Sequence, residues 1–125
     1  MGKADMLSPS VLAFVGDAVY GLFVRTELAK VNRPSGDLHR LSVKLVNAVS
    51  QAEAFKIIEP LLTEEETAVF KRGRNFHTST TPKRATNAQY HTATGLETLF
   101  GYLYLSGNVK RAEELFEKII TDFEY

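Results

Sequence analysis

Apolar residues recur at helical spacing along most of the chain, whereas strand signals are weak. No clean alternation of apolar and polar residues lies between turn residues, and no Asn-Gly or Asp-Gly hairpin pair is present. Ser8 followed by Pro9 is typical of a helix start, because serine caps the first amides and proline suits the first helical position. This helix is expected to run to about Lys30.

Two shorter helices are expected next. Apolar residues recur at helical spacing in LHRLSVKLVNAV, after a loop in which Ser35 or Asp37 is the expected cap. A third helix is expected over about residues 50–58, since Pro60 cannot continue it.

The segment TEEE predicts the start of a fourth helix. The Thr63 hydroxyl can accept a hydrogen bond from the Glu66 amide while the Glu66 carboxylate reaches back, an arrangement known as a capping box. Gly73 is expected just past the end of this helix. The residues expected to face inward are Ala68, Val69 and Phe70.

A long loop and two further helices complete the expected fold. The loop covers residues 74–86, and its length is typical of functional loops. A second core helix is expected over NAQYHTATGLETLFGYLYL, ended by SGN, and an amphipathic helix over residues 109–125. Its apolar face comprises Val109, Ala112, Leu115, Phe116, Ile119 and Ile120. The fold class is therefore predicted to be all-α, with about six helices and no sheet.

The composition narrows the class of protein. At 125 residues and 44% hydrophobic, the chain is predicted to form one domain, residues 1–125. Cysteine is absent, which excludes disulfides, cysteine-ligated zinc and cysteine nucleophiles. Asp17 and Glu97 interrupt the two longest apolar runs, so no membrane span is expected. A cytoplasmic protein is the expectation.

Charge is distributed unevenly, although the net charge is zero. No acidic residue lies between Glu66 and Glu97, an interval that holds five cations and two of the three histidines. The cations are Lys71, Arg72, Arg74, Lys83 and Arg84. A basic segment in a neutral domain predicts an anionic partner at one place on the surface.

Two carboxylates interrupt the two most apolar helices. Asp17 lies in LAFVGDAVYGLFV and Glu97 in LETLFGYLYL, and the nearby Gly16 and Gly101 permit close helix packing. If these helices touch, repulsion between the carboxylates favours a bound cation. Oxygen ligands favour a hard ion such as Mg²⁺, with Mn²⁺ as a substitute.

A structural interpretation of these acids stays open. Asp17 could accept hydrogen bonds from a helix N-terminus, and Glu97 could pair with a cation such as Arg25. The acid-free basic segment that leads into the helix of Glu97 favours the other interpretation, a metal-dependent phosphodiesterase.

Three segments resemble the catalytic domain of the ribonuclease III family, in the order in which the family has them. LAFVGDAVY is similar to the signature on its first core helix, LSVKLVNAVSQA to its next helix, and GLETLFGYLYLSGN to its second catalytic helix. Together they cover about residues 8–108. With FKRGRN and TTPK, the chain resembles Mini-ribonuclease III, the short bacterial branch of that family, which lacks a double-stranded-RNA-binding domain.

The resemblance implies a Mg²⁺-dependent endoribonuclease that cuts double-stranded RNA and leaves 5′-phosphate and 3′-hydroxyl ends. It implies that Asp17 and Glu97 are catalytic and bind the metal. Three further acidic positions of the larger enzymes are Ser10, Ala13 and Thr94 here. More of the metal coordination is therefore expected from water and RNA.

The resemblance also implies partners. The expected substrate is the precursor of large-subunit (23S) ribosomal RNA, with a large-subunit ribosomal protein as a helper that presents it. A homodimer is implied as well. The segment AVYGLFV is apolar around most of its helix, more than a bundle of this size can easily cover, and a two-fold interface would bury the surplus.

The residues expected to contact RNA phosphates and 2′-hydroxyls are basic or polar. They are Lys71, Arg72, Arg74, Asn75, Lys83 and Arg84, with Arg40 and Lys44 as an extension and Thr78 to Thr81 as hydroxyl donors. Lys71 and Arg72 equally suit the end of a helix, where cations are favourable, and Arg40 and Lys44 equally suit a solvated face. The histidines His39, His77 and His91 lack metal-ligand spacing and are expected to be solvated or to contact RNA.

Two alternatives belong to other classes of protein. One is a catalytically silent relative that binds structured RNA or the ribosome, which the missing acids favour and the retained Asp17 and Glu97 oppose. The other is a helical protein-interaction module whose basic loop docks on an acidic partner. That module predicts no dependence on a divalent metal.

Overall fold

Six α-helices and no strand make up the described part of the chain, residues 7–76 and 85–123 of a computed structural model. The helices are α1 (Pro9–Leu28), α2 (Ser35–Leu45), α3 (Ala48–Ile58), α4 (Glu64–Arg74), α5 (Asn87–Leu105) and α6 (Val109–Asp122). Two 3₁₀ turns, η2 (Ala29–Val31) and η3 (Glu59–Leu61), follow α1 and α3. The predicted all-α class is confirmed.

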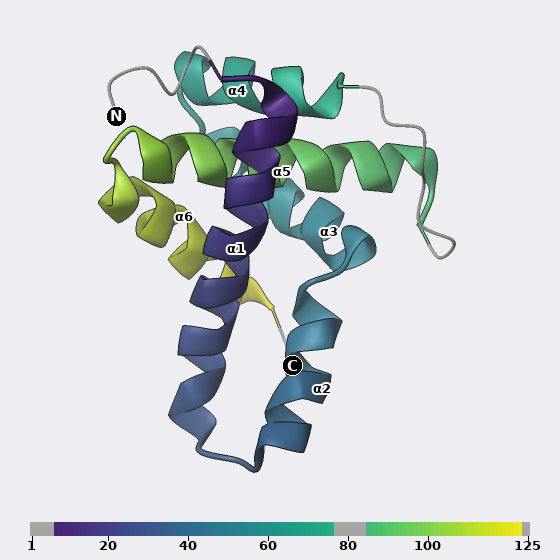
Figure 1. The fold of residues 1–125 in the computed structure, drawn as a ribbon, viewed down its shortest axis with the longest axis vertical. Coiled ribbons are helices and arrows are strands. Elements are labelled where there is room, and N and C mark those ends of the chain that lie inside the picture. The colour runs from purple at the N-terminus through teal and green to yellow at the C-terminus, as the bar shows by residue number, and fades with distance from the viewer. Residues whose placement is uncertain (1–6, 77–84, 124–125) are drawn as a thin grey trace.

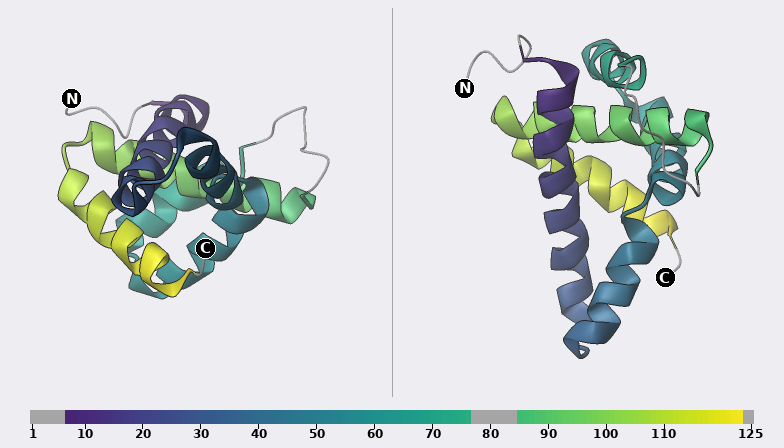
Figure 2. Two further views of the ribbon diagram at one scale, coloured as in Figure 1. Left: turned by 90° about the horizontal axis from the view of Figure 1, so that it is seen from below. Right: turned by 45° about the vertical axis from the view of Figure 1, so that its right-hand side comes forward.

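Helix α5 is the central element. It lies across the middle of the molecule with α4 along one side, α3 and α6 along the other, and α1 crossing it (Figure 1). The far half of α1 and the whole of α2 form a hairpin that projects from this body (Figure 2). None of the described helices combines the length and apolar character that a bilayer crossing requires.

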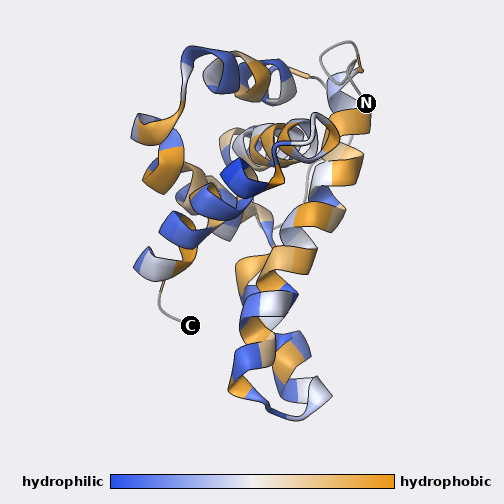
Figure 3. Cartoon of the chain, turned by 90° about the vertical axis from the view of Figure 1, so that its left-hand side faces the viewer, coloured by the Kyte–Doolittle hydropathy of each residue, from blue (hydrophilic) through white to orange (hydrophobic). Residues whose placement is uncertain are grey.

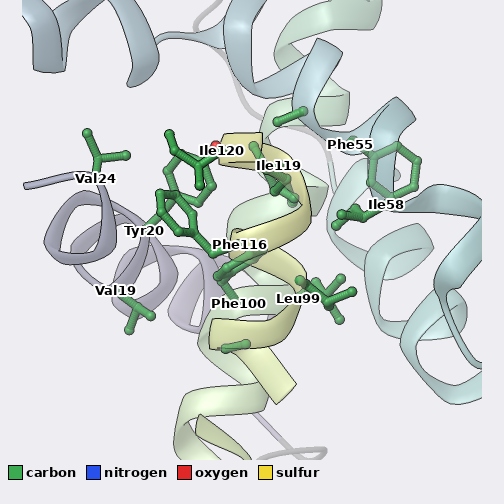
Figure 4. Packing of buried hydrophobic residues seen from close by; sticks show 14 of the residues in the cluster. Val19, Tyr20, Val24, Phe55, Ile58, Leu99, Phe100, Phe116, Ile119 and Ile120 are labelled. Atoms are coloured by element: carbon green, nitrogen blue, oxygen red, sulfur yellow. The ribbon is translucent and has the colours of Figure 1, made fainter. Parts of the chain in front are cut away.

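The core is formed by buried side chains from all six helices. Tyr20 of α1 packs edge-on against Phe100 of α5 and Phe116 of α6, with ring centroids 5.3 and 5.6 Å away (Figure 4). Phe55 of α3 stacks on Phe70 of α4 at 3.7 Å. Such aromatic pairs add packing energy beyond burial alone, so α1 is held against α5 and α6, and α3 against α4.

The predicted starts of α1 and α4 are confirmed, and a side chain caps each of these helices. The Ser8 hydroxyl accepts a hydrogen bond from the Val11 amide, and α1 begins at Pro9 as expected. Thr63 and Glu66 form the predicted capping box of α4. These are local interactions between residues three apart, which is why the sequence reveals them.

The predicted starts of α2 and α3 are wrong by a few residues. Helix α2 begins at Ser35, because the Pro34 carbonyl already accepts from the amides of the first turn; neither Ser35 nor Asp37 caps it. Helix α3 begins at Ala48, two residues before the predicted start, because the side chain of Asn47 accepts a hydrogen bond from the Ser50 amide and caps the helix there.

Two predictions about α4 are also wrong. Gly73 lies inside the last turn, buried, rather than past the helix end, and a β-carbon there would lie 2.1 Å from the Thr98 hydroxyl oxygen. The glycine therefore serves helix packing against α5. Val69 and Phe70 are buried as predicted, but Ala68 is exposed.

Candidate active site

The crossing of α1 and α5 brings Asp17 and Glu97 together. The two side chains are within hydrogen-bonding range of each other, and the charge of Asp17 acts on Glu97. Asp17 comes from the middle of α1 and Glu97 from the middle of α5. The structure thus places one carboxylate from each of the two apolar helices at a single point.

Two glycines make this close approach possible. A β-carbon on Gly16 would lie 1.7 Å from the carbonyl oxygen of Glu97, and one on Gly101 would lie 1.9 Å from the carbonyl oxygen of Leu12. The helices therefore meet backbone to backbone. Because Gly16 adjoins Asp17 in the sequence, this contact sets the separation of the carboxylates.

Asp17 lies at the edge of the packed face of its helix. Asp17 is exposed, whereas its neighbour Gly16 is buried and Glu97 is half-buried. Consecutive residues of an α-helix are turned by about 100°, so a helix that packs by one face leaves the next residue at its edge. Asp17 thus lies at the rim of the α1–α5 contact, open to solvent.

The electrostatics of the site are unfavourable to two negative charges. Burial and the charge of Asp17 raise the pKa of Glu97 from its ordinary 4.5 to about 8, although the Gln51 amide, which donates to Glu97 Oε2 at 3.3 Å, lowers it in part. Burial and the charge of Glu97 raise the pKa of Tyr20 as well. The site therefore favours a proton or a cation between its carboxylates.

The alternative interpretation required a protein cation beside Glu97. Arg25 does not fill this role: its Nη1 donates to the Gly21 carbonyl of its own helix at 3.3 Å. Within residues 7–76 and 85–123, none of the ion pairs involves Asp17 or Glu97. A purely structural explanation of the two acids is thereby weakened.

The donor chemistry fits a hard divalent cation. Two carboxylates in contact offer oxygen ligands and a negative charge that a cation would offset, which suits Mg²⁺ with several retained waters. Across the described ranges, no group of three or more histidine or acidic side chains is arranged so that it could hold a metal ion. At the positions where larger relatives are expected to carry acids, the Ser10 hydroxyl lies 3.2 Å from that of Ser8 and the Thr94 hydroxyl donates to Tyr90.

Comparison with known proteins decides the family. The Ribonuclease III domain model matches residues 10–108. A Mini-ribonuclease 3 of Thermoanaerobacter sp. (strain X514) is 50% identical, covering 94% of this chain and 84% of that protein. A second, from Clostridium tetani, is 41% identical, covering 98% of this chain and 83% of that protein. The chain belongs to the ribonuclease III family.

A solved structure agrees with this assignment. The crystal structure of a protein from Fusobacterium nucleatum matches with a TM-score of 0.85 and 30% sequence identity, covering 91% of this chain and 93% of that one. The predicted ribonuclease III-like fold and the resemblance to the Mini-ribonuclease III branch are both confirmed.

In this ribonuclease III domain, two of the predicted RNA contacts, at the end of α4, lie near the start of α5. Arg74 and Asn75 line a hollow of about 400 Å³, together with Ala88, His91 and Thr92. The Arg74 Nε donates to Asn75 Oδ1 at 3.2 Å, and the guanidinium carbon lies 5.7 Å from the centre of the Phe70 ring. The guanidinium is therefore oriented, although Arg74 as a residue is exposed.

The other predicted RNA contacts have different surroundings. Lys71 and Arg72 are exposed on α4, and Arg72 donates to the Leu7 carbonyl at 3.0 Å. Arg40 pairs with Asp37, and Lys44 is exposed. Both lie on α2, at the opposite end of the molecule from α4 (Figure 1), so the structure does not bring the two groups together. Outside the described residues lie Lys83, Arg84, His77 and Thr78 to Thr81.

The sequence interpretation missed two polar partners. Gln51 of α3 is buried and reaches Glu97. Arg111 of α6 binds both carboxylate oxygens of the buried Glu66, at 2.8 and 2.9 Å, which lowers the pKa of Glu66. No local sequence signal marks either partner, because Gln51 and Arg111 lie 46 and 45 positions from the acids they bind.

Proposed function

We propose that this protein is a metal-dependent endoribonuclease that cuts double-stranded RNA at Asp17 and Glu97. The observation that carries the proposal is the contact of these two carboxylates without a cationic partner among the described residues. Membership of the ribonuclease III family supports the reaction and the substrate class.

The two acids have different surroundings and different tasks. Glu97, whose pKa is about 8, would release its proton to water on binding a cation, and Asp17 would contribute a carboxylate at the solvent-facing rim, where a duplex can approach. Together they would hold Mg²⁺, with Mn²⁺ as a substitute. A bound ion would supply Lewis-acid chemistry toward a water and the RNA phosphate, and hydrolysis would leave 5′-phosphate and 3′-hydroxyl ends.

Duplex binding is proposed to rest on phosphate and 2′-hydroxyl contacts. Arg74 and Asn75 are the best placed of the described candidates, because they line the hollow beside the start of α5. Lys71 and Arg72 extend this surface, and Arg40 and Lys44 would contact RNA separately from it. An interface built from so few cations should bind weakly and with a strong salt dependence.

A homodimer is proposed from the outer face of α1. Phe14 is 81% exposed and Leu22 61% exposed, and Val11 adds to the same face. Figure 3 shows the apolar segments of α1 at the outer edge of the molecule. A two-fold contact along this face would remove these side chains from water and would place two Asp17–Glu97 sites in one assembly.

The proposed biological substrate is the precursor of large-subunit (23S) ribosomal RNA. The resemblance to the Mini-ribonuclease III branch supports this choice. A large-subunit ribosomal protein is proposed as a helper, because a domain with weak duplex affinity gains from a partner that shapes or presents its substrate.

Cleavage of a long duplex RNA at low salt, with and without Mg²⁺, tests the function. The parent should cut only with Mg²⁺, and Asp17→Asn, which keeps the shape of the side chain and removes its charge, should not cut. If the parent leaves duplex RNA intact, precursor ribosomal RNA in ribosomal particles is the next substrate. Failure there would favour a catalytically silent RNA-binding domain, and equal cutting by parent and variant would show that Asp17 is structural.

A further inference from the structure

Gln51 differs from the other buried polar residues in the described part of the chain. Those residues are Ser42, Gln51, Glu66 and Thr98. The Ser42 hydroxyl donates to a carbonyl of its own helix, and that of Thr98 to the carbonyls of Thr94 and Pro9. Glu66 is bound by its own helix cap and by Arg111. Gln51, which is 4% exposed, instead reaches from α3 to the candidate active site.

The contact is a single hydrogen bond between two helices. Gln51 Nε2 donates to Glu97 Oε2 at 3.3 Å, and the two residues are 46 positions apart in the sequence. An amide is a neutral donor. It can therefore hold one carboxylate oxygen without cancelling the negative charge that attracts a cation. A lysine or arginine at this position would cancel that charge.

The start of α3 is built to hold Gln51 in place. The Asn47 side-chain amide donates to the carbonyls of Val43 and Lys44, at 2.9 and 3.1 Å, and its oxygen accepts from the Ser50 amide at 2.9 Å. The Ser50 hydroxyl adds a bond to the Lys44 carbonyl at 2.7 Å. The turn between α2 and α3 is thereby fixed one residue before Gln51, so the amide is presented at a defined position.

We propose that Gln51 is a positioning residue that keeps the Glu97 carboxylate turned toward Asp17, so that both acids are presented to one divalent cation. The proposal rests on the proposed function of those two acids. Partners that orient a metal ligand commonly contribute 10- to 100-fold to metal affinity or activity.

The test compares Gln51→Met, which keeps the length of the side chain and removes the donor, with Thr98→Val. Thr98 is a matched control, because it is buried, adjoins Glu97 in the sequence and bonds only to backbone carbonyls. Mn²⁺ and Mg²⁺ affinities are measured by calorimetry on protein without RNA, thermal unfolding reports the folded fraction, and cleavage of duplex RNA gives kcat and KM.

Gln51→Met should bind either ion about 10- to 100-fold more weakly and lose kcat to a similar extent, with little change in KM for RNA. Thr98→Val should keep the metal affinity of the parent. Parent-like metal affinity in Gln51→Met would overturn the proposal, as would an equal loss in Thr98→Val, which would show a general packing effect. If the proposed function is wrong, the parent protein itself neither binds the ions nor cuts RNA. That result would overturn the proposed function and, with it, the role of Gln51.

Discussion

Gly16 of α1 lies against the backbone of Glu97 of α5, so closely that a β-carbon on Gly16 would be 1.7 Å from the Glu97 carbonyl oxygen. Neither side of this contact is a flexible side chain that can move aside. Any larger residue at position 16 must push the helices apart. The same contact that joins two core helices therefore also determines whether Asp17 and Glu97 can meet.

The first prediction concerns this contact. Gly16→Ala should lower the free energy of unfolding by about 3 kcal/mol, the upper end of the cost of overpacking, and should abolish Mg²⁺-dependent cutting by the fraction that still folds. Gly21→Ala is the control, because its β-carbon would meet only the Arg25 guanidinium, at 3.0 Å, and alanine raises helix propensity by up to about 1 kcal/mol. Urea unfolding measures the free energy of unfolding of both variants. Equal stability of the two variants would contradict the role given to Gly16.

The second prediction concerns pH. The pKa of Glu97 is about 8 in the folded protein and near its ordinary 4.5 in the unfolded chain, so the folded state keeps a proton that the unfolded state loses between these values. Stability is therefore lost as pH rises through this window, by up to about 1.4 kcal/mol per pH unit. Glu97→Gln does not titrate, so without metal it should be more stable than the parent at pH 9 and similar at pH 4. Identical pH profiles from urea unfolding would contradict this.

The third prediction concerns the ion pair between α4 and α6. Arg111→Met should destabilise the protein by about 3 kcal/mol, because it leaves the Glu66 carboxylate buried without its partner. The double variant with Glu66→Gln should recover most of this loss. Since Arg111 lowers the pKa of Glu66, its contribution is present above the ordinary pKa of a glutamate and is lost as pH falls through the lowered value. Thermal unfolding between pH 7 and pH 3 measures both effects; a double variant as unstable as Arg111→Met would contradict the pairing.

The fourth prediction concerns assembly. Phe14→Ser should convert a dimer into a monomer in sedimentation, because it removes the most exposed apolar side chain of the proposed interface. Val43→Ser, which removes an exposed apolar side chain from α2, should leave the assembly unchanged. A parent protein that sediments as a monomer would rule out the dimer outright.

The fifth prediction separates the two groups of candidate RNA contacts. Arg74→Gln should weaken duplex binding and lower the slope of log affinity against log salt by about 1. Arg40→Gln should have a smaller effect, because Arg40 already pairs with Asp37. The opposite order of effects in a salt titration would move the RNA surface from α4 to α2.

The helices themselves were predictable from the sequence because their signals are local. The Ser8 cap, the capping box of Thr63 and Glu66 and the apolar spacing of α6 each depend on residues three or four apart. The pairing of Gly16 with Gly101 was also readable, since small residues on two apolar helices indicate close packing. The sequence also singled out Asp17 and Glu97, because few carboxylates interrupt such helices; their role as site residues stays a prediction.

The orientation of side chains between elements was decided only by the tertiary structure. The burial of a residue depends on which side of its helix the neighbouring helices occupy. Only the structure therefore shows that Ala68 is exposed, that Gly73 packs against α5 and that Asp17 lies at a rim. The partners Gln51 and Arg111 lie 46 and 45 positions from the acids they bind, so no local pattern connects them. The sequence determined the helices and their chemistry through short-range hydrogen bonds and apolar spacing. Long-range packing around α5 determined which of those groups share a site.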